Sequence, residues 1–219
     1  MNQYIGKRGF LSLVAVTGLC LFIISPADSA TYYVRLDGGT ATQCTGLADA
    51  PYPGSGTNRD CAFSHPFWAI APQGNNPTKM AGGDTLIIDG SNQSGYAMGF
   101  TAPNTADTSK CAASWAYDCY MRSIPSGPDP AHPTRILGKG WDTGCAFPPQ
   151  LWGNERAAMV INLRGSDNVE LQCLEITDRS DCQEHGPKAC NRTSPPFGKW
   201  ATMGLEAWDS DNVLLKNVD

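Results

Sequence analysis

The residues that could carry chemistry gather in the last fifth of this 219-residue chain. Four carboxylates there could supply oxygen ligands to a calcium ion: Asp178, Asp181, Glu206 and Asp209. Two cations in the same region, Arg179 and Lys199, could act on a proton as a catalytic base. The competing interpretation is that all six are solvated turn residues, and that interpretation requires no special geometry.

Cysteines are the second set of reactive residues. The chain has nine, and eight of them follow residue 30. An even number of cysteines in an exported chain predicts disulfides, although eight cysteines allow about a hundred pairings. Cys173 lies in a predicted strand and could instead be a buried free thiol. Short spacings favour Cys44 with Cys61, Cys111 with Cys119, and Cys182 with Cys190, which leaves Cys145 with Cys173.

A structural zinc cluster is disfavoured, because no two cysteines have the Cys-x-x-Cys spacing of such sites. The three histidines, His65, His132 and His185, share no spacing that would make a catalytic or metal-binding set. We therefore expect each histidine to be structural or exposed.

The first thirty residues resemble a removable export leader. Lys7 and Arg8 precede an uncharged apolar run over residues 10–25, and residues 27–30 are Ala-Asp-Ser-Ala. A basic start, a short apolar run and small residues are typical of a secretory signal peptide. The apolar run is shorter than the roughly 20 residues that a membrane-spanning helix needs. We expect cleavage after Ala30, a single domain over residues 31–219, and a secreted, periplasmic or cell-surface protein without a membrane anchor.

Composition narrows the class of protein. Removal of residues 1–30 leaves fourteen basic and twenty acidic residues, a formal charge of −6. No basic patch occurs, so nucleic acid is not an expected partner. Low charge with abundant glycine and proline favours a β protein with many turns.

An internal repeat organises the end of the chain. Residues 166–169 and 210–213 both read Ser-Asp-Asn-Val, an offset of 44 residues. Apolar residues flank both copies with matching spacing, so that Leu171 corresponds to Leu215 and Leu174 to Val218. Each copy predicts a strand, a tight turn and a second strand, because asparagine and aspartate suit tight turns.

One copy of such a unit has an apolar face with nothing to bury it, so copies are expected to stack. Stacking would place Val169 over Val213 and Leu171 over Leu215. The alternative is two unrelated β-hairpins of a sandwich. Further strands are predicted at residues 31–34, 84–89 and 133–138, whereas the proline-rich run over residues 124–130 is expected to be a loop.

The pattern Asp-Asn-Val-x-Leu-x-x-Leu-x-Ile-x-Asp over residues 167–178 resembles a coil of the right-handed parallel β-helix proteins of the pectate-lyase-like superfamily. The opening of the chain is similar: Thr-Tyr-Tyr-Val at residues 31–34, Pro-Phe-Trp-Ala-Ile at 66–70 and Gly-Gly-Asp-Thr at 82–85. The resemblance implies a disulfide-tied solenoid and a capping helix over residues 62–71. It specifies the fold better than the function.

For function, the resemblance implies a polysaccharide as partner and lyase-type β-elimination on an acidic glycan. In that chemistry a cation such as calcium neutralises a carboxylate and a base removes the neighbouring proton. The known signatures of polygalacturonases and of the best-studied pectate lyases are absent. A non-catalytic adhesion or glycan-binding protein is therefore the alternative. The chain stops inside a coil at Asp219, so we also consider an incomplete, inactive fragment.

Overall fold

The computed structural model describes residues 29–72, 78–91, 94–99, 120–154, 157–180 and 201–219. The expected leader, up to residue 28, lies outside this range. The described part is all-β, with one short 3-10 helix, η1 (Pro66–Trp68), and no α-helix. Its strands are β1 (Thr31–Gly39), β2 (Thr85–Ile88), β3 (Tyr96–Gly99), β4 (Thr134–Gly138), β5 (Gln150–Asn154), β6 (Ala157–Asn162), β7 (Val169–Thr177), β8 (Ala201–Glu206) and β9 (Val213–Val218).

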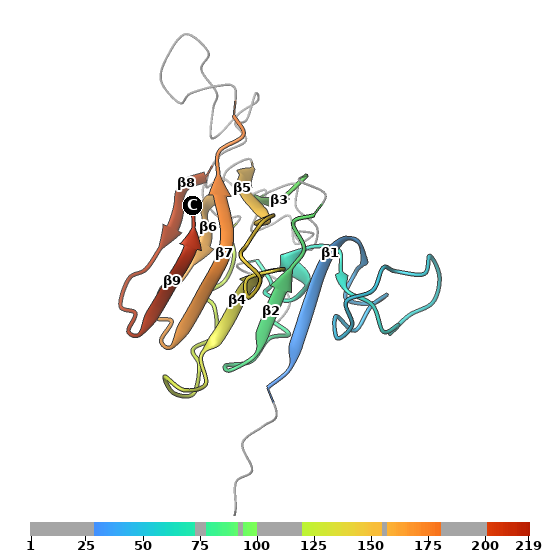
Figure 1. Cartoon of the computed structure of the whole chain (residues 1–219), viewed down its shortest axis with the longest axis horizontal. Helices are drawn as coiled ribbons and strands as arrows, with labels where there is room; N and C mark the ends of the chain where they lie inside the picture. Colours follow the sequence, from blue (N-terminus) through green and yellow to red (C-terminus); the bar gives the residue numbers. More distant parts are fainter. Residues whose placement is uncertain (1–28, 73–77, 92–93, 100–119, 155–156, 181–200) are drawn as a thin grey trace, which may run out of the picture.

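All pairings between these named strands are parallel. The first sheet runs in the order β1, β2, β4, β7 and β9 (Figure 1). A second sheet contains β3, β5 and the end of β7, and a third contains β6 and β8. Consecutive strands of one hairpin would be antiparallel, so the alternative of two β-hairpins is wrong.

The repeat stacks as its sequence predicts. Strand β9 pairs with β7 so that Val169 faces Val213, Leu171 faces Leu215 and Leu174 faces Val218. The 44-residue offset in the sequence is therefore the separation between two neighbouring layers of the structure. A chain that returns to the same register after each excursion forms stacked layers, which is compatible with a β-solenoid.

The core lies between the three sheets and is built from side chains in register. Leu86, Ile136 and Leu171 are successive neighbours on β2, β4 and β7, and all three are completely buried. Ile88 is also completely buried, as the alternation in the predicted strand over residues 84–89 indicates. Each such aliphatic side chain contributes roughly 1.5–3 kcal/mol to folding.

The turns before β7 and β9 share one backbone conformation. Asn168 and Asn212 both have a φ of 54°, in the left-handed region that asparagine tolerates. Asn168 Nδ2 donates to the carbonyl of Gly127 (3.0 Å), and Asn212 Nδ2 donates to Asn168 Oδ1 (3.2 Å). The asparagines thus link three consecutive layers. The same offset relates two more pairs of positive-φ residues: Gly165 with Asp209, and Cys173 with Asn217.

The prediction of a capping helix over residues 62–71 is wrong, because this segment contains only the 3-10 turn η1. Phe63 already pairs in parallel with Val34 of β1, which leaves few residues for a helix. Pro72 then disfavours helical backbone at the residue before it. Phe67 is still completely buried at this end of the core, so the segment covers the core without forming a helix.

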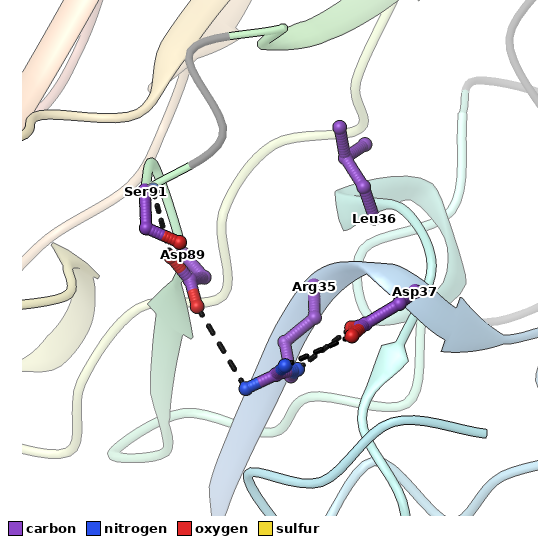
Figure 2. Close-up of a pocket in the computed structure, with 5 residues that line it drawn as sticks. All are labelled: Arg35, Leu36, Asp37, Asp89 and Ser91. Carbon is purple, nitrogen blue, oxygen red and sulfur yellow. Dashed lines mark hydrogen bonds and ion pairs between the residues drawn. The ribbon is translucent and has the colours of Figure 1, made fainter. Parts of the chain in front are cut away.

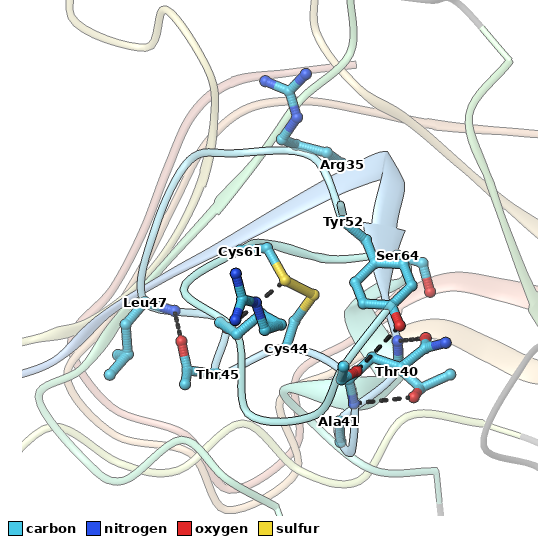
Figure 3. The surroundings of a disulfide bond; sticks show 12 residues. Arg35, Thr40, Ala41, Cys44, Thr45, Leu47, Tyr52, Cys61 and Ser64 are labelled. Carbon is cyan, nitrogen blue, oxygen red and sulfur yellow. Dashed lines mark hydrogen bonds between the residues drawn. A yellow bond between two sulfur atoms is a disulfide. The ribbon is translucent and has the colours of Figure 1, made fainter. Parts of the chain in front are cut away.

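Within the described residues there are two disulfides, one inside a loop and one between a loop and a strand. Cys44 bonds Cys61 within the loop that follows β1, and both residues are completely buried (Figure 3). Cys145 bonds Cys173 of β7, which rules out a free thiol at residue 173. The first is one of the three pairings that short spacing favours, and the second is the pairing that those three leave over. The other two pairings, Cys111 with Cys119 and Cys182 with Cys190, lie outside the described residues.

Candidate functional site

The outer face of the second sheet carries polar and aromatic side chains, which we call the Trp152 face: Gln150, Trp152, Glu175, Thr177 and Arg179. In β5, Leu151 is completely buried whereas Gln150 and Trp152 on either side are half-buried. Strand alternation therefore points the latter two outward. The parallel register then sets Gln150 beside Glu175 and Trp152 beside Thr177.

Arg179 lies just beyond the end of β7 and folds back over this face. Its guanidinium carbon is 5.4 Å from the centre of the Trp152 ring, within the range of a cation–π contact. One terminal nitrogen donates to the carbonyl of Ser94 (2.6 Å), and the other donates to Gln150 Oε1. The cation is thus held in one orientation by an aromatic ring and two oxygens.

Gln150 connects Arg179 to a carboxylate. Its Nε2 lies 2.9 Å from each oxygen of Glu175, while its Oε1 accepts from Arg179. Gly95 leaves room for this arrangement: it has a φ of +65°, and a Cβ there would lie 2.6 Å from the Gln150 carbonyl and 3.2 Å from the Arg179 guanidinium. A side chain at residue 95 would therefore clash with the Gln150 backbone and crowd the arginine.

Chemically, this face combines the two features that an acidic sugar requires. An indole ring offers an apolar surface for the carbon–hydrogen face of a sugar ring. A guanidinium offers a rigid fork of donors that matches a carboxylate. Guanidinium groups stay protonated in proteins, so Arg179 is suited to binding a carboxylate and poorly suited to the role of base.

A second cluster of charges crosses the first sheet at the ends of β1, β2 and β4, around a pocket that Figure 2 shows. Arg35 donates to both carboxylate oxygens of Asp37 (2.8 and 2.9 Å) and to Asp49 (3.1 Å). Asp89, one layer further, lies 3.8 Å from Arg35 and 3.4 Å from Lys139, which also contacts Asp49 at 2.6 Å. Each charge has an opposite neighbour, so this cluster clamps three layers together.

The pKa shifts in this cluster agree with a clamp of permanently charged groups. The hydrogen bond from Arg35 holds the pKa of Asp37 below its ordinary value. Burial alone would raise the pKa of Asp89, but hydrogen bonds from Ser91 and the charge of Lys139 leave it lowered. The hydrogen bond to Asp49 raises the pKa of Lys139. None of these groups is brought toward neutral pH, as a proton-transfer catalyst requires.

A third opening lies at the start of β2 and β4. Arg135 pairs with Glu170 (2.6 Å), and its guanidinium lies 4.8 Å from the centre of the Trp141 ring. At its rim, exposed His132 contacts Asp129 at 2.9 Å. The carboxylate of Glu170 is only 9% exposed and already compensates Arg135. We therefore rank this opening below the Trp152 face as a place for an anionic ligand.

The residues that the sequence singled out are distributed as follows. Arg179 belongs to the Trp152 face. Asp178 follows β7 and accepts from the backbone of Ser180 (2.7 Å). Glu206 ends β8 and pairs with Arg164 (2.6 Å), and Asp209 lies exposed in the turn before β9.

The remaining two candidates, Lys199 and Asp181, lie outside the described residues. Within the described ranges, no three His, Cys, Asp or Glu side chains are grouped so as to hold a metal ion. The calcium site and the base therefore stay predictions.

Two of the three histidines can be placed. His65 is almost completely buried: its Nε2 contacts the carbonyl of Ala97 (3.0 Å), and its Nδ1 accepts from the Phe67 amide (3.1 Å). Burial lowers the pKa of His65 to about 3. This histidine is structural and neutral, and His132 is exposed. His185 lies outside the described residues.

Sequence reasoning missed Trp152, the aromatic member of the site. The signal available was weak, because residues 150–154 follow two prolines and have only one buried aliphatic side chain between outward residues. The strand is evident only from its pairing with β7.

Comparison of the chain with protein-family models, with curated proteins and with solved structures gives no match. Within the described ranges, the structure contains no helix long and apolar enough to span a membrane. The stacked parallel strands and the geometry of the Trp152 face are therefore the features that bear on function.

Proposed function

We propose that the chain is part of an exported right-handed parallel β-helix protein of the pectate-lyase-like type, and that it binds and cleaves an acidic polysaccharide. The stacked parallel layers and the hydrogen bonds of Asn168 and Asn212 between layers support the fold assignment. The leader-like first thirty residues and the two disulfides support export, because disulfides persist in oxidising compartments.

The observation that carries the proposed substrate class is the position of Arg179 over Trp152. The cation–π contact and the bonds to Ser94 and Gln150 fix the guanidinium before any ligand arrives. A preorganised donor fork loses little entropy when it binds a carboxylate. A uronate unit would stack on the indole ring while its carboxylate is bound by the arginine.

The proposed reaction is β-elimination next to that carboxylate. A base removes the proton on carbon 5, the bond between carbon 4 and the glycosidic oxygen breaks, and a double bond forms between carbons 4 and 5. The leaving oxygen takes up a proton. Arg179 would neutralise the carboxylate and stabilise the developing charge, and Lys199 is the proposed base.

An assay for unsaturated uronide products tests this proposal. The secreted protein is incubated with several polyuronates, with and without calcium, and the conjugated double bond of the product is followed by its ultraviolet absorbance. We expect product with at least one polyuronate and none with neutral polysaccharides. Absence of product with every polyuronate would refute the lyase activity.

A non-catalytic glycan-binding protein is the second candidate. The observation that favours it is that the placed candidate base, Arg179, is a guanidinium engaged with two oxygens, and such a group holds its proton. Under this alternative the protein binds the acidic glycan at the Trp152 face and releases no unsaturated product.

A further inference from the structure

The residue before the first strand makes two bonds to the next layer. The amide nitrogen of Ala30 donates to Asp84 Oδ1 (2.8 Å), and the carbonyl of Ala30 accepts from the amide of Thr85 (2.9 Å). The second bond extends the pairing of β1 with β2, whose first register pair is Thr31 with Thr85. Ala30 is therefore an integral part of the first layer, although the leader was expected to include it.

Asp84 is a nearly buried carboxylate whose two oxygens each accept a backbone amide hydrogen bond. It is 6% exposed, and its Oδ2 accepts from the amide of Ala81 (2.7 Å). No Lys, Arg or His of the described segments forms an ion pair with it. A buried carboxylate is unfavourable unless a positive charge or several hydrogen bonds compensate it. The other carboxylate oxygen of Asp84, Oδ1, accepts from the backbone nitrogen of Ala30.

Three cleavage points are compared with the rule that export peptidases require small residues at the last and third-last positions of the leader. Cleavage after Ala30 would place charged Asp28 third from the end. Cleavage after Ala27 or after Ser29 would satisfy the rule, with Ser25 and Ala27 as the respective third-last residues.

We propose that the leader is cleaved between Ser29 and Ala30, and that the new α-ammonium of Ala30 forms a partly buried ion pair with Asp84. Cleavage after Ala30 would remove both bonds to the second layer and leave Asp84 and Thr85 without these partners. Cleavage after Ala27 would keep the bonds but leave Asp84 without a cation. Only cleavage after Ser29 keeps both bonds and adds the missing charge.

The chemical step is hydrolysis of one peptide bond by water. The carbonyl carbon of Ser29 gains a hydroxyl group and leaves with the leader as a carboxylate. The nitrogen of Ala30 takes up both protons of that water and becomes an ammonium group, whose ordinary pKa is about 8. The ion pair between the first two layers therefore exists only in the processed chain, so processing stabilises the fold. The inference rests on the proposed export of the protein.

The first test is the mass and N-terminal sequence of the protein secreted from its full-length precursor. We expect a chain that begins at Ala30. A chain that begins at Thr31 or Asp28 would overturn the inference while leaving export intact. A chain that keeps residues 1–29 would refute export and the inference with it.

The second test measures what the ammonium contributes. Chains beginning at Ala30 and at Ser29 are released from a cleavable fusion and compared by thermal unfolding. We expect the Ala30 chain to unfold about 3 °C higher or more at pH 7. The difference should disappear above about pH 9, as the ammonium loses its proton, and in the matched Asp84→Asn pair. Equal unfolding temperatures of the two wild-type chains at pH 7 would overturn the ion pair.

Discussion

His65 shows how one buried side chain sets the response of the fold to acid. In the unfolded chain this histidine binds a proton below about pH 6.5, whereas burial lowers its pKa in the folded protein to about 3. Between these two pKa values, His65 therefore binds a proton in the unfolded state but not in the folded state. The stability contributed by neutral His65 is complete above pH 6.5 and is lost as the pH falls toward 3.

We predict that the free energy of unfolding falls by about 1.4 kcal/mol per pH unit below pH 6, until other groups titrate. Denaturant titrations between pH 7 and pH 5 measure this slope, in a range above the lowered pKa values of Asp37 and Asp89. The His65→Gln variant has no titrating side chain at residue 65. It should be less stable at pH 7, and its free energy of unfolding should hardly change between pH 7 and pH 5. A wild-type slope in that variant would show that another group is responsible.

Asn168 combines backbone conformation and hydrogen bonding, and two substitutions separate them. Asn168→Gly keeps the left-handed conformation but loses the bonds to Gly127 and Asn212, at a cost of about 1–2 kcal/mol. Asn168→Ala should cost about 1 kcal/mol more, because alanine is strained at a φ of 54°. Urea denaturation of both variants checks the order. An alanine variant as stable as the glycine variant would contradict the conformational argument.

At the scale of elements, the disulfide between Cys145 and Cys173 spans 28 residues and ties the loop after β4 to β7. A loop of that length predicts a loss of about 3–4 kcal/mol when the bond is removed. Cys173 also has a φ of 57° and occupies the position that asparagine fills in the next layer.

We therefore predict different stabilities for two variants that both lack this bond. Cys145→Ala with Cys173→Gly should be more stable by about 1 kcal/mol than Cys145→Ala with Cys173→Ala, because glycine adopts the left-handed region without strain and, like alanine, buries no polar group. Thermal unfolding under oxidising conditions measures both. If the alanine pair were the more stable one, the backbone at residue 173 would not be strained as proposed.

Elements with a strong local pattern could be predicted from the sequence, and elements defined by pairing could not. The Ser-Asp-Asn-Val repeat predicts the β7–β9 register because turn and apolar positions recur together. Strands β3 and β5 were missed: β3 has four residues, and β5 follows Pro148 and Pro149, which favour a loop interpretation. Similarly, the aromatic residues at 67 and 68 suggested a helix, whereas Pro72 and the Phe63 bridge limit it to one turn.

At the scale of the whole molecule, the stacking of layers creates a site that no local pattern contains. Arg179 could be singled out from the sequence as a charged residue beside a loop. Its partners Trp152 and Gln150 are almost thirty residues earlier and become neighbours only because β5 pairs with β7. The proposed recognition of an acidic glycan would thus be a property of two adjacent layers.

Binding of a soluble uronate oligosaccharide tests this central claim most directly. Calorimetric titration is carried out with the acidic oligosaccharide and with its neutral counterpart, on the wild type, on Arg179→Gln, and on Arg164→Gln as a matched control. Arg164 is a cation outside the Trp152 face, where it pairs with Glu206. The unfolding temperatures of all three proteins are measured first, to establish that both variants are as stably folded as the wild type.

We predict that the wild type and Arg164→Gln bind the acidic oligosaccharide equally and prefer it to the neutral one. Arg179→Gln should bind the acidic form roughly 10–100-fold more weakly, because it loses one charge-assisted contact with the carboxylate. Undiminished binding by Arg179→Gln, or failure of the wild type to bind any uronate oligosaccharide, would contradict the account.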